Sequence, residues 1–318
     1  METAILDILG SLPIPVGVAL VLLIAAYWRG SSVHDGSKVR RLASPAAGLI
    51  IAAAMLCAYW YSKAGGWSIP PRQSIEWIWA ATAAGALGAI ILSAVPHAWA
   101  RVLLRVMLVS VVMVGVSWRK MHTQWSAGES SLWLGSSIAA LSLAWVLLDH
   151  FVALPRGPAS AGLAPVKSET VHAWSSPLAL MGWAGLTSQA LLSTGGLQIG
   201  KFAAILAMVL GAVVVVAVFR PSIDLSGGGV GVVTLLLGLL IFSGYHFSSL
   251  DKLGWLGALL VLAPIFAWGV DVLFLRRLGR VPRSIGRVAA ISLLPLIVLS
   301  VSIPAAIKAS QESSEYGY

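Results

Sequence analysis

Apolar stretches long enough to cross a membrane follow one another along almost the whole chain, separated by short polar segments. An α-helix rises about 1.5 Å per residue, so about 20 apolar residues span the hydrocarbon core of a bilayer. Because the apolar stretches have about this length, the pattern predicts about ten transmembrane helices. Their predicted ranges are residues 9–28, 44–62, 75–95, 101–118, 131–152, 177–194, 201–219, 229–247, 254–274 and 288–307.

The composition argues against an ordinary water-soluble domain. Of the 318 residues, 58% are hydrophobic and 10% are charged, and the mean hydropathy is +0.89, whereas soluble domains carry about 25% charged residues. We therefore expect an all-α polytopic membrane protein in which residues 1–318 form a single integral membrane domain. The first apolar stretch lacks the basic flank of a secretory signal, so we expect it to be retained.

The positive charges predict the orientation of the protein in the membrane. Lys and Arg collect in the cytoplasmic connectors of membrane proteins, and 14 of the 21 Lys and Arg residues fall in or beside the odd-numbered connectors. The richest of these segments follows the ninth predicted helix and reads RRLGRVPRSIGR. We expect these connectors to face the cytoplasm and to contact anionic lipid headgroups, with both termini outside. The composition is typical of a bacterial inner (cytoplasmic) membrane protein.

Two segments of the chain resemble each other, WLGSSIAALSLAWVLLD at 133–149 and WLGALLVLAPIFAWGVD at 255–271. Earlier pairs of markers keep the same order: Ser-Pro at 44 and 176, Gly-Gly at 65 and 195, and Pro at 96 and 221. We interpret them as a tandem repeat of four helices, 44–155 and 176–280, flanked by the first and last helices. Because four is an even number, the copies share one orientation, the parallel type of repeat. The alternative is two five-helix halves of inverted topology, as in the drug/metabolite transporter class.

Polar residues inside the predicted helices indicate a possible binding site. Thr187, Ser188 and Gln189 form the most polar stretch near the middle of a predicted helix. Buried hydroxyl and amide groups must find partners on other helices, or they bind a neutral or weakly polar solute. Pro264 leaves a backbone carbonyl without its usual donor, as the broken helices that line transporter cavities do. Ser142 occupies the position of Pro264 in the first copy.

Charged residues inside a bilayer are costly and are therefore candidates for function. Asp149 and Asp271 lie in the last turns of the fifth and ninth predicted helices, and Arg105 lies in the first turns of the fourth. We expect helix-end ion pairs, such as Arg105 with Asp149, or alternatively a cytoplasmic gate. No carboxylate lies near the middle of any predicted helix, which weakens the case for a proton- or sodium-coupled carrier.

Two histidines, His122 and His246, occupy matching positions in the proposed copies, at the outer helix ends. They are either ordinary interfacial side chains or a pair that binds a metal, haem or quinone. The sequence contains no HExxH motif and no Cys-His spacing, so no firm metal centre and no cofactor is indicated. The basic segments lack interleaved aromatic residues, so we expect no nucleic-acid partner. We find no catalytic motif and assign no catalytic residue.

The sequence leaves two main functions open. The first is a permease-like protein with a solute site between the repeats, formed by Ser142, Thr187, Ser188, Gln189 and Pro264. The alternative is a non-catalytic membrane subunit, an assembly or scaffold partner of a larger membrane complex. An enzyme linked to haem or quinone through the histidines is a third, weaker hypothesis.

Overall fold

The computed structural model describes residues 13–29, 36–62, 69, 71, 73–152, 172–220, 223, 225, 226, 228–247 and 256–315. Within these residues the chain forms ten α-helices, two short 3-10 helices and no strand. The α-helices are α2 (Pro13–Arg29), α3 (Gly36–Ser62), α4 (Trp77–Ala94), α5 (Ala98–Thr123), α6 (Ala127–Val152), α7 (Ser175–Ser193), α8 (Leu197–Phe219), α9 (Gly228–Phe247), α10 (Ala258–Leu273) and α11 (Arg280–Glu315). The 3-10 helices are η2 (Ser74–Glu76) and η4 (Leu275–Arg277). The predicted all-α class is confirmed.

Among the described helices, eight are long and apolar enough to cross a membrane: α3, α4, α5, α6, α8, α9, α10 and α11. The chain is therefore a multi-helix transmembrane protein. Helix α2 is apolar but shorter, with 17 residues. Helix α7 has 19 residues, but its serines, Thr187 and Gln189 lower its hydropathy. Each predicted span overlaps one helix, and the count of ten membrane crossings stays a prediction.

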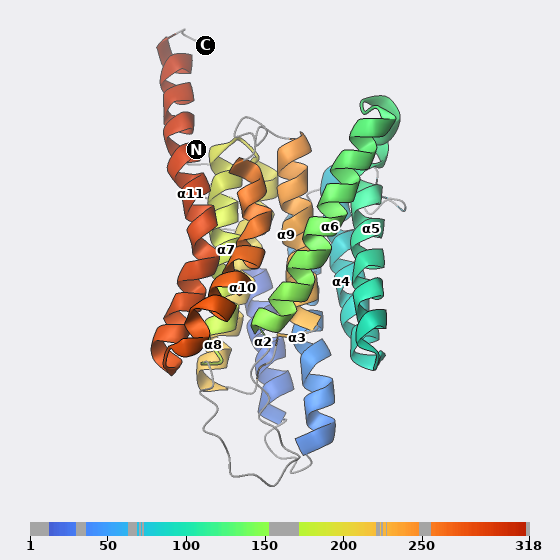
Figure 1. Cartoon of the computed structure of the whole chain (residues 1–318), viewed down its shortest axis with the longest axis vertical. Coiled ribbons are helices and arrows are strands. Elements are labelled where there is room, and N and C mark those ends of the chain that lie inside the picture. The colour runs from blue at the N-terminus through green and yellow to red at the C-terminus, as the bar shows by residue number, and fades with distance from the viewer. Residues whose placement is uncertain are drawn as a thin grey trace.

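Helix α9 lies at the centre of the bundle (Figure 1). It packs against α3, α4, α5, α6, α7, α8 and α10, and every residue from Gly228 to Gly244 is buried. The sequence explains this position, because a helix that is apolar on all sides is stable only inside a protein or in lipid. Helix α5, by contrast, packs mainly against α4, α6 and α9 and exposes Met107, Val111 and Trp118.

Glycines bring two helices close to α9. A Cβ atom on Gly48 of α3 would lie 2.6 Å from the carbonyl carbon of Gly228. A Cβ atom on Gly85 of α4 would lie 2.9 Å from the Cα of Val232. Both distances are shorter than atoms tolerate, so only glycine permits these backbones to approach so closely. Small residues at helix interfaces are typical of membrane proteins, where packing replaces the hydrophobic effect between helices.

The helices alternate in direction, so the bundle has two distinct ends. At one end, which we call the basic end, α5 and α11 begin and α6 and α10 finish, as the lower part of Figure 1 shows. At the opposite end, α5 and α9 finish and α6 begins, and α11 extends beyond its neighbours. The predicted repeat pairs α3–α6 with α7–α10. Since α9 is central and its counterpart α5 is peripheral, the two sets pack differently, and the repeat stays a prediction.

Candidate functional site

The first feature of the candidate site is an ion pair between α5 and α6. Arg105 donates a hydrogen bond from Nη2 to Oδ2 of Asp149. The Arg105 guanidinium carbon also lies 5.9 Å from the centroid of the Trp145 ring, one turn before Asp149 on the same face of α6. The side chains of Arg105 and Asp149 are only 6% and 14% exposed. Charges this far from water are costly unless they are paired, so the pair fastens α5 to α6.

A second ion pair joins α10 to α11. Asp271 accepts hydrogen bonds of 3.1 Å from Nε and Nη2 of Arg283, one on each carboxylate oxygen. The Nε of Arg287 lies 3.4 Å from Oδ1 of the same carboxylate. Arg283 and Arg287 are four residues apart, so both lie on one face of α11. The short helix η4 reverses the chain between α10 and α11 and allows this face to meet Asp271.

The two ion pairs are connected through α6. The Arg287 guanidinium carbon lies 4.3 Å from the centroid of the Phe151 ring of α6, and α6 packs against α10. Three arginines thus meet two carboxylates, which leaves one positive charge in excess. Arg287 is 2% exposed, and its Nη1 has no hydrogen-bond partner in the described part of the chain. We call Arg105, Asp149, Asp271, Arg283 and Arg287 the ion-pair layer, and it links α5, α6, α10 and α11.

Hydroxyl groups without partners form the second feature of the candidate site. Among the described residues, five buried hydroxyls have no hydrogen-bond partner: those of Ser117, Ser142, Thr187, Thr234 and Ser243. Thr234 and Ser243 belong to α9, and the others belong to α5, α6 and α7, each of which packs against α9. The usual solution inside a helix is a bond to the preceding turn, as Thr82 makes to the carbonyl of Ile78 at 2.6 Å. Unpartnered buried groups are uncommon and need an explanation, such as a water or a ligand.

The three consecutive polar residues of α7 have different environments. Thr187 is completely buried. Ser188 donates to the carbonyl of Gly200 at 2.9 Å and so joins α7 to α8. Gln189 is exposed on the outside of the bundle. Of the three, Thr187 is therefore the residue whose hydroxyl is both buried and free.

The carbonyl that Pro264 leaves without an intrahelical donor is not free. Proline has no N–H, so the carbonyl of Leu260 loses the donor that residue 264 would normally provide. The indole Nε1 of Trp183 on α7 donates to that carbonyl at 2.8 Å, and Trp183 is completely buried. The proline therefore fastens α10 to α7 through a tryptophan. Ser142 lies two turns before Asp149 and shares its face of α6, which is directed toward α5.

The structure gives the two predicted histidines different partners. His122 is exposed, and its Nδ1 lies 2.8 Å from the carbonyl oxygen of Trp118. The ring of His246 has four aromatic neighbours with centroids 4.4–5.1 Å away: Trp125, Trp133, Phe242 and Tyr245. Within the described residues, no group of three or more His, Cys, Asp or Glu side chains is arranged to hold a metal ion. The second Trp-Leu-Gly marker begins at Trp255, which lies outside the described residues.

Sequence reasoning missed Arg283, Arg287, Phe151 and Trp183 as members of the site. The two arginines had a signal, because their spacing of four residues places both on one helix face. That signal was hidden in a basic segment that also serves to orient the protein. Phe151 and Trp183 had none, because an aromatic residue in an apolar helix is usually part of the core.

The chain was compared with protein families and with curated proteins, and neither comparison gives a match. The class of protein therefore rests on the fold and the site. They define a polytopic α-helical membrane protein with an ion-pair layer near one end and unpartnered hydroxyls around its central helix.

Proposed function

We propose that this protein is a permease-like membrane protein that moves a small neutral or weakly polar solute across the membrane. The observation that supports this proposal is the set of five buried hydroxyl groups without partners on α9 and its neighbours. A hydroxyl without a partner in an apolar environment costs free energy. A chain that keeps several such groups has a use for them, and a polar solute or water passing along α9 supplies the missing partners.

The chemistry of these groups favours a neutral solute over an ion. Each hydroxyl offers one donor and two acceptor sites, and none carries a charge. Thr187 and Thr234 are completely buried. The carboxylates of Asp149 and Asp271, which could attract a cation, are engaged by arginines in the ion-pair layer.

In this proposal the ion-pair layer acts as a gate. Asp149 and Asp271 hold arginines from α5 and α11, so the basic end is closed while these contacts persist. Passage of a solute requires the helices to move apart at this end, as in the rocking motions of transporters. We assign the basic end to the cytoplasm of a bacterial inner membrane, with anionic headgroups at its connectors and both termini outside.

The proposal is tested with the full-length protein in liposomes, by stopped-flow light scattering after mixing with urea or glycerol. We expect faster solute entry than in protein-free liposomes. Thr234→Val and Thr187→Val should slow entry severalfold, because valine keeps the shape of threonine and removes the hydroxyl. Ser300→Ala is the matched control, since this exposed hydroxyl already donates to the carbonyl of Ile297 at 2.8 Å. Entry at the protein-free rate, or equal rates in all variants, would reject the proposal.

The second candidate function is a non-catalytic subunit of a larger membrane complex, and Gln189 is the observation that favours it. Among the described residues of α7, Gln189 alone is exposed. An amide at the outer surface of a membrane helix is stabilised when a neighbouring helix accepts its hydrogen bonds. Purification in mild detergent should then recover a defined partner with the wild type, and less of it with Gln189→Leu. A lone monomer from the native membrane would argue against this function.

A further inference from the structure

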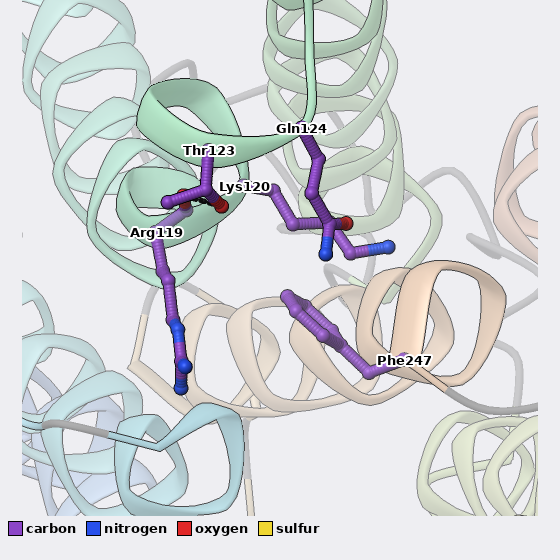
Figure 2. Close-up of a pocket in the computed structure, with 5 residues that line it drawn as sticks. All are labelled: Arg119, Lys120, Thr123, Gln124 and Phe247. Carbon is purple, nitrogen blue, oxygen red and sulfur yellow. Dashed lines mark hydrogen bonds between the residues drawn. The ribbon is translucent and has the colours of Figure 1, made fainter.

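A cavity of about 420 Å³ opens at the end of the bundle opposite the ion-pair layer. Among the described residues, its lining consists of Arg119, Lys120, Thr123, Gln124 and Phe247. The first three belong to the end of α5, Gln124 follows directly, and Phe247 is the last residue of α9. Figure 2 shows the side chains of Lys120 and Gln124 reaching toward Phe247, with Arg119 extended separately from them. The volume is within the range of small-molecule sites.

The polar groups of the cavity are only partly engaged by the protein. Lys120 donates from Nζ to the carbonyl of His246 and lies 4.8 Å from the centroid of the Phe247 ring, so it is held against the end of α9. Thr123 donates its hydroxyl to the carbonyl of Arg119 at 2.8 Å. The Arg119 guanidinium and the Gln124 amide make no hydrogen bond or ion pair with other described residues. These two groups are therefore free to donate to a ligand.

The charge of the lining residues indicates the charge of the ligand. Among the described residues, the lining contains two cations, Arg119 and Lys120, and no carboxylate. Glu129, five residues after Gln124, is occupied at the start of α6, where its Oε2 accepts from the backbone N–H of Ser126 at 2.8 Å. Carbonyl groups at the ends of α5 and α9 partly offset the positive charge, but Lys120 already pairs with one of them. The charge of the described lining therefore favours an anion at Arg119.

The position of the cavity relative to the membrane indicates which anion is available. The cavity lies at the ends of two membrane-spanning helices, the level of the lipid headgroups. Below Arg119, helix α5 exposes Trp118 and Val111, which are 59% and 63% exposed and lie two turns apart on one face. Acyl chains can pack on this face while a headgroup enters the cavity. Arginine binds phosphate through two parallel N–H···O bonds, which gives geometric specificity as well as attraction.

We infer that this cavity binds a phosphate group, carried by a phospholipid headgroup or by a soluble phosphate ester. Arg119 is the principal ligand-binding residue, and Gln124 supplies a second donor. Lys120 adds positive charge and braces α5 against α9. This site is independent of the proposed solute permeation and lies at the other end of the bundle from the ion-pair layer.

The test measures binding to the full-length protein in dodecyl maltoside by isothermal titration calorimetry. The probes are dioctanoyl phosphatidylglycerol and glycerol phosphate. We expect saturable binding that Arg119→Gln weakens about tenfold or more, because a hydrogen-bonded charge pair is lost. Lys201→Gln is the matched control, since it removes one positive charge from α8 at the same end of the bundle, outside the lining. Arg119→Lys should weaken binding less than Arg119→Gln.

The outcomes separate the sources of the phosphate. Binding of the lipid without glycerol phosphate identifies a headgroup site, and binding of both identifies a site for soluble phosphate esters. Equal weakening by Arg119→Gln and Lys201→Gln would indicate diffuse attraction and overturn the inference. The absence of saturable binding of either probe to the wild type would also overturn it. Because Arg119 is exposed, its variants should fold, and an unchanged thermal midpoint verifies this.

Discussion

Helices α6 and α10 finish with the same sequence feature, a tryptophan followed within one turn by an aspartate, but they use it in opposite directions. In α6, Asp149 pairs with Arg105 of the preceding helix. In α10, Asp271 pairs with Arg283 and Arg287 of the following helix. Both aspartates mark the same end of the bundle. The shared pattern thus marks where a helix ends, whereas neighbouring helices decide which partner its charge finds.

The tryptophans of the two helices also differ, in how deeply they are buried. Trp145 of α6 is completely buried, and its ring occupies the space that the missing side chain of Gly231 leaves on α9. Trp268 of α10 is only half-buried. Helix α10 is instead held by a residue of another helix, because Trp183 of α7 donates to the Leu260 carbonyl that Pro264 leaves without a donor. The shared tryptophan thus holds α6 on α9, whereas α10 is held on α7 through Pro264, which has no equivalent in α6.

The largest effect is expected from removing the better-buried aspartate. Asp271→Ala leaves Arg283 and Arg287 without their carboxylate, and breaking a buried pair in this way costs about 3–5 kcal/mol. Asp149→Ala should cost less, because it strands one arginine, and the Asp149 side chain is 14% exposed against 4% for Asp271. Both are measured as free energies of unfolding in mixed dodecyl maltoside and SDS micelles.

A second substitution distinguishes a lost charge pair from a lost contact. In the Asp271→Ala background, Arg287→Met removes the most deeply buried stranded cation and should restore part of the stability. If Arg287→Met destabilises this background further, the cost of Asp271→Ala does not come from the unpaired arginine. If Asp149→Ala proves the more damaging change, the contrast between α6 and α10 is reversed.

An intermediate loss of stability is expected where Trp145 packs against Gly231. A Cβ atom on Gly231 would lie 2.4 Å from the Trp145 ring, so Gly231→Ala forces the ring to move and should cost about 1–3 kcal/mol. Gly269 is the matched control beside Trp268, since nothing lies within 4 Å of its added Cβ. Gly269→Ala should be neutral or slightly stabilising, because alanine is the better helix former. Equal costs at the two positions would mean that Trp145 is no more tightly packed than Trp268.

The helices could be located from the sequence because hydrophobic length is a direct requirement of the bilayer. The central position of α9 was not predicted, although its sequence has no charged residue between Gly228 and Phe247. A helix that faces lipid and a helix that faces protein on all sides have equally apolar sequences, so composition alone does not separate them. The tight contact of Gly48 with Gly228 also depends on a pairing that no local pattern encodes.

From the sequence, residues of the candidate site could be recognised mainly where placing that residue type in a membrane costs free energy. Asp149, Asp271 and Arg105 were noticed because charges in a bilayer are expensive. Thr187 was noticed for a similar reason, as a polar group in an apolar helix, whereas Ser142 was noticed because it occupies the position of Pro264 in the proposed repeat. The donor to the Leu260 carbonyl, which Pro264 leaves without its usual partner, was not predicted. This donor, Trp183, lies 77 residues before Leu260 in the chain. Only the packing of α7 against α10 brings them together.

The smallest expected effect concerns this contact. Trp183→Phe removes the indole N–H and leaves the Leu260 carbonyl without a donor. Side-chain hydrogen bonds inside membrane proteins contribute about 0.6–1.7 kcal/mol, and we expect a loss of this size. Pro264→Ala restores a backbone N–H that can donate to the same carbonyl from within α10.

The double-mutant cycle of these two substitutions isolates the hydrogen bond. Trp183→Phe should cost less in the Pro264→Ala background than in the wild type, because the carbonyl then has an intrahelical donor. The cost of the smaller ring is the same in both backgrounds and cancels in the difference. Equal costs would show that Trp183 stabilises α10 by packing alone. Pro264 would then no longer explain why this helix is anchored from α7 while α6 is anchored on α9.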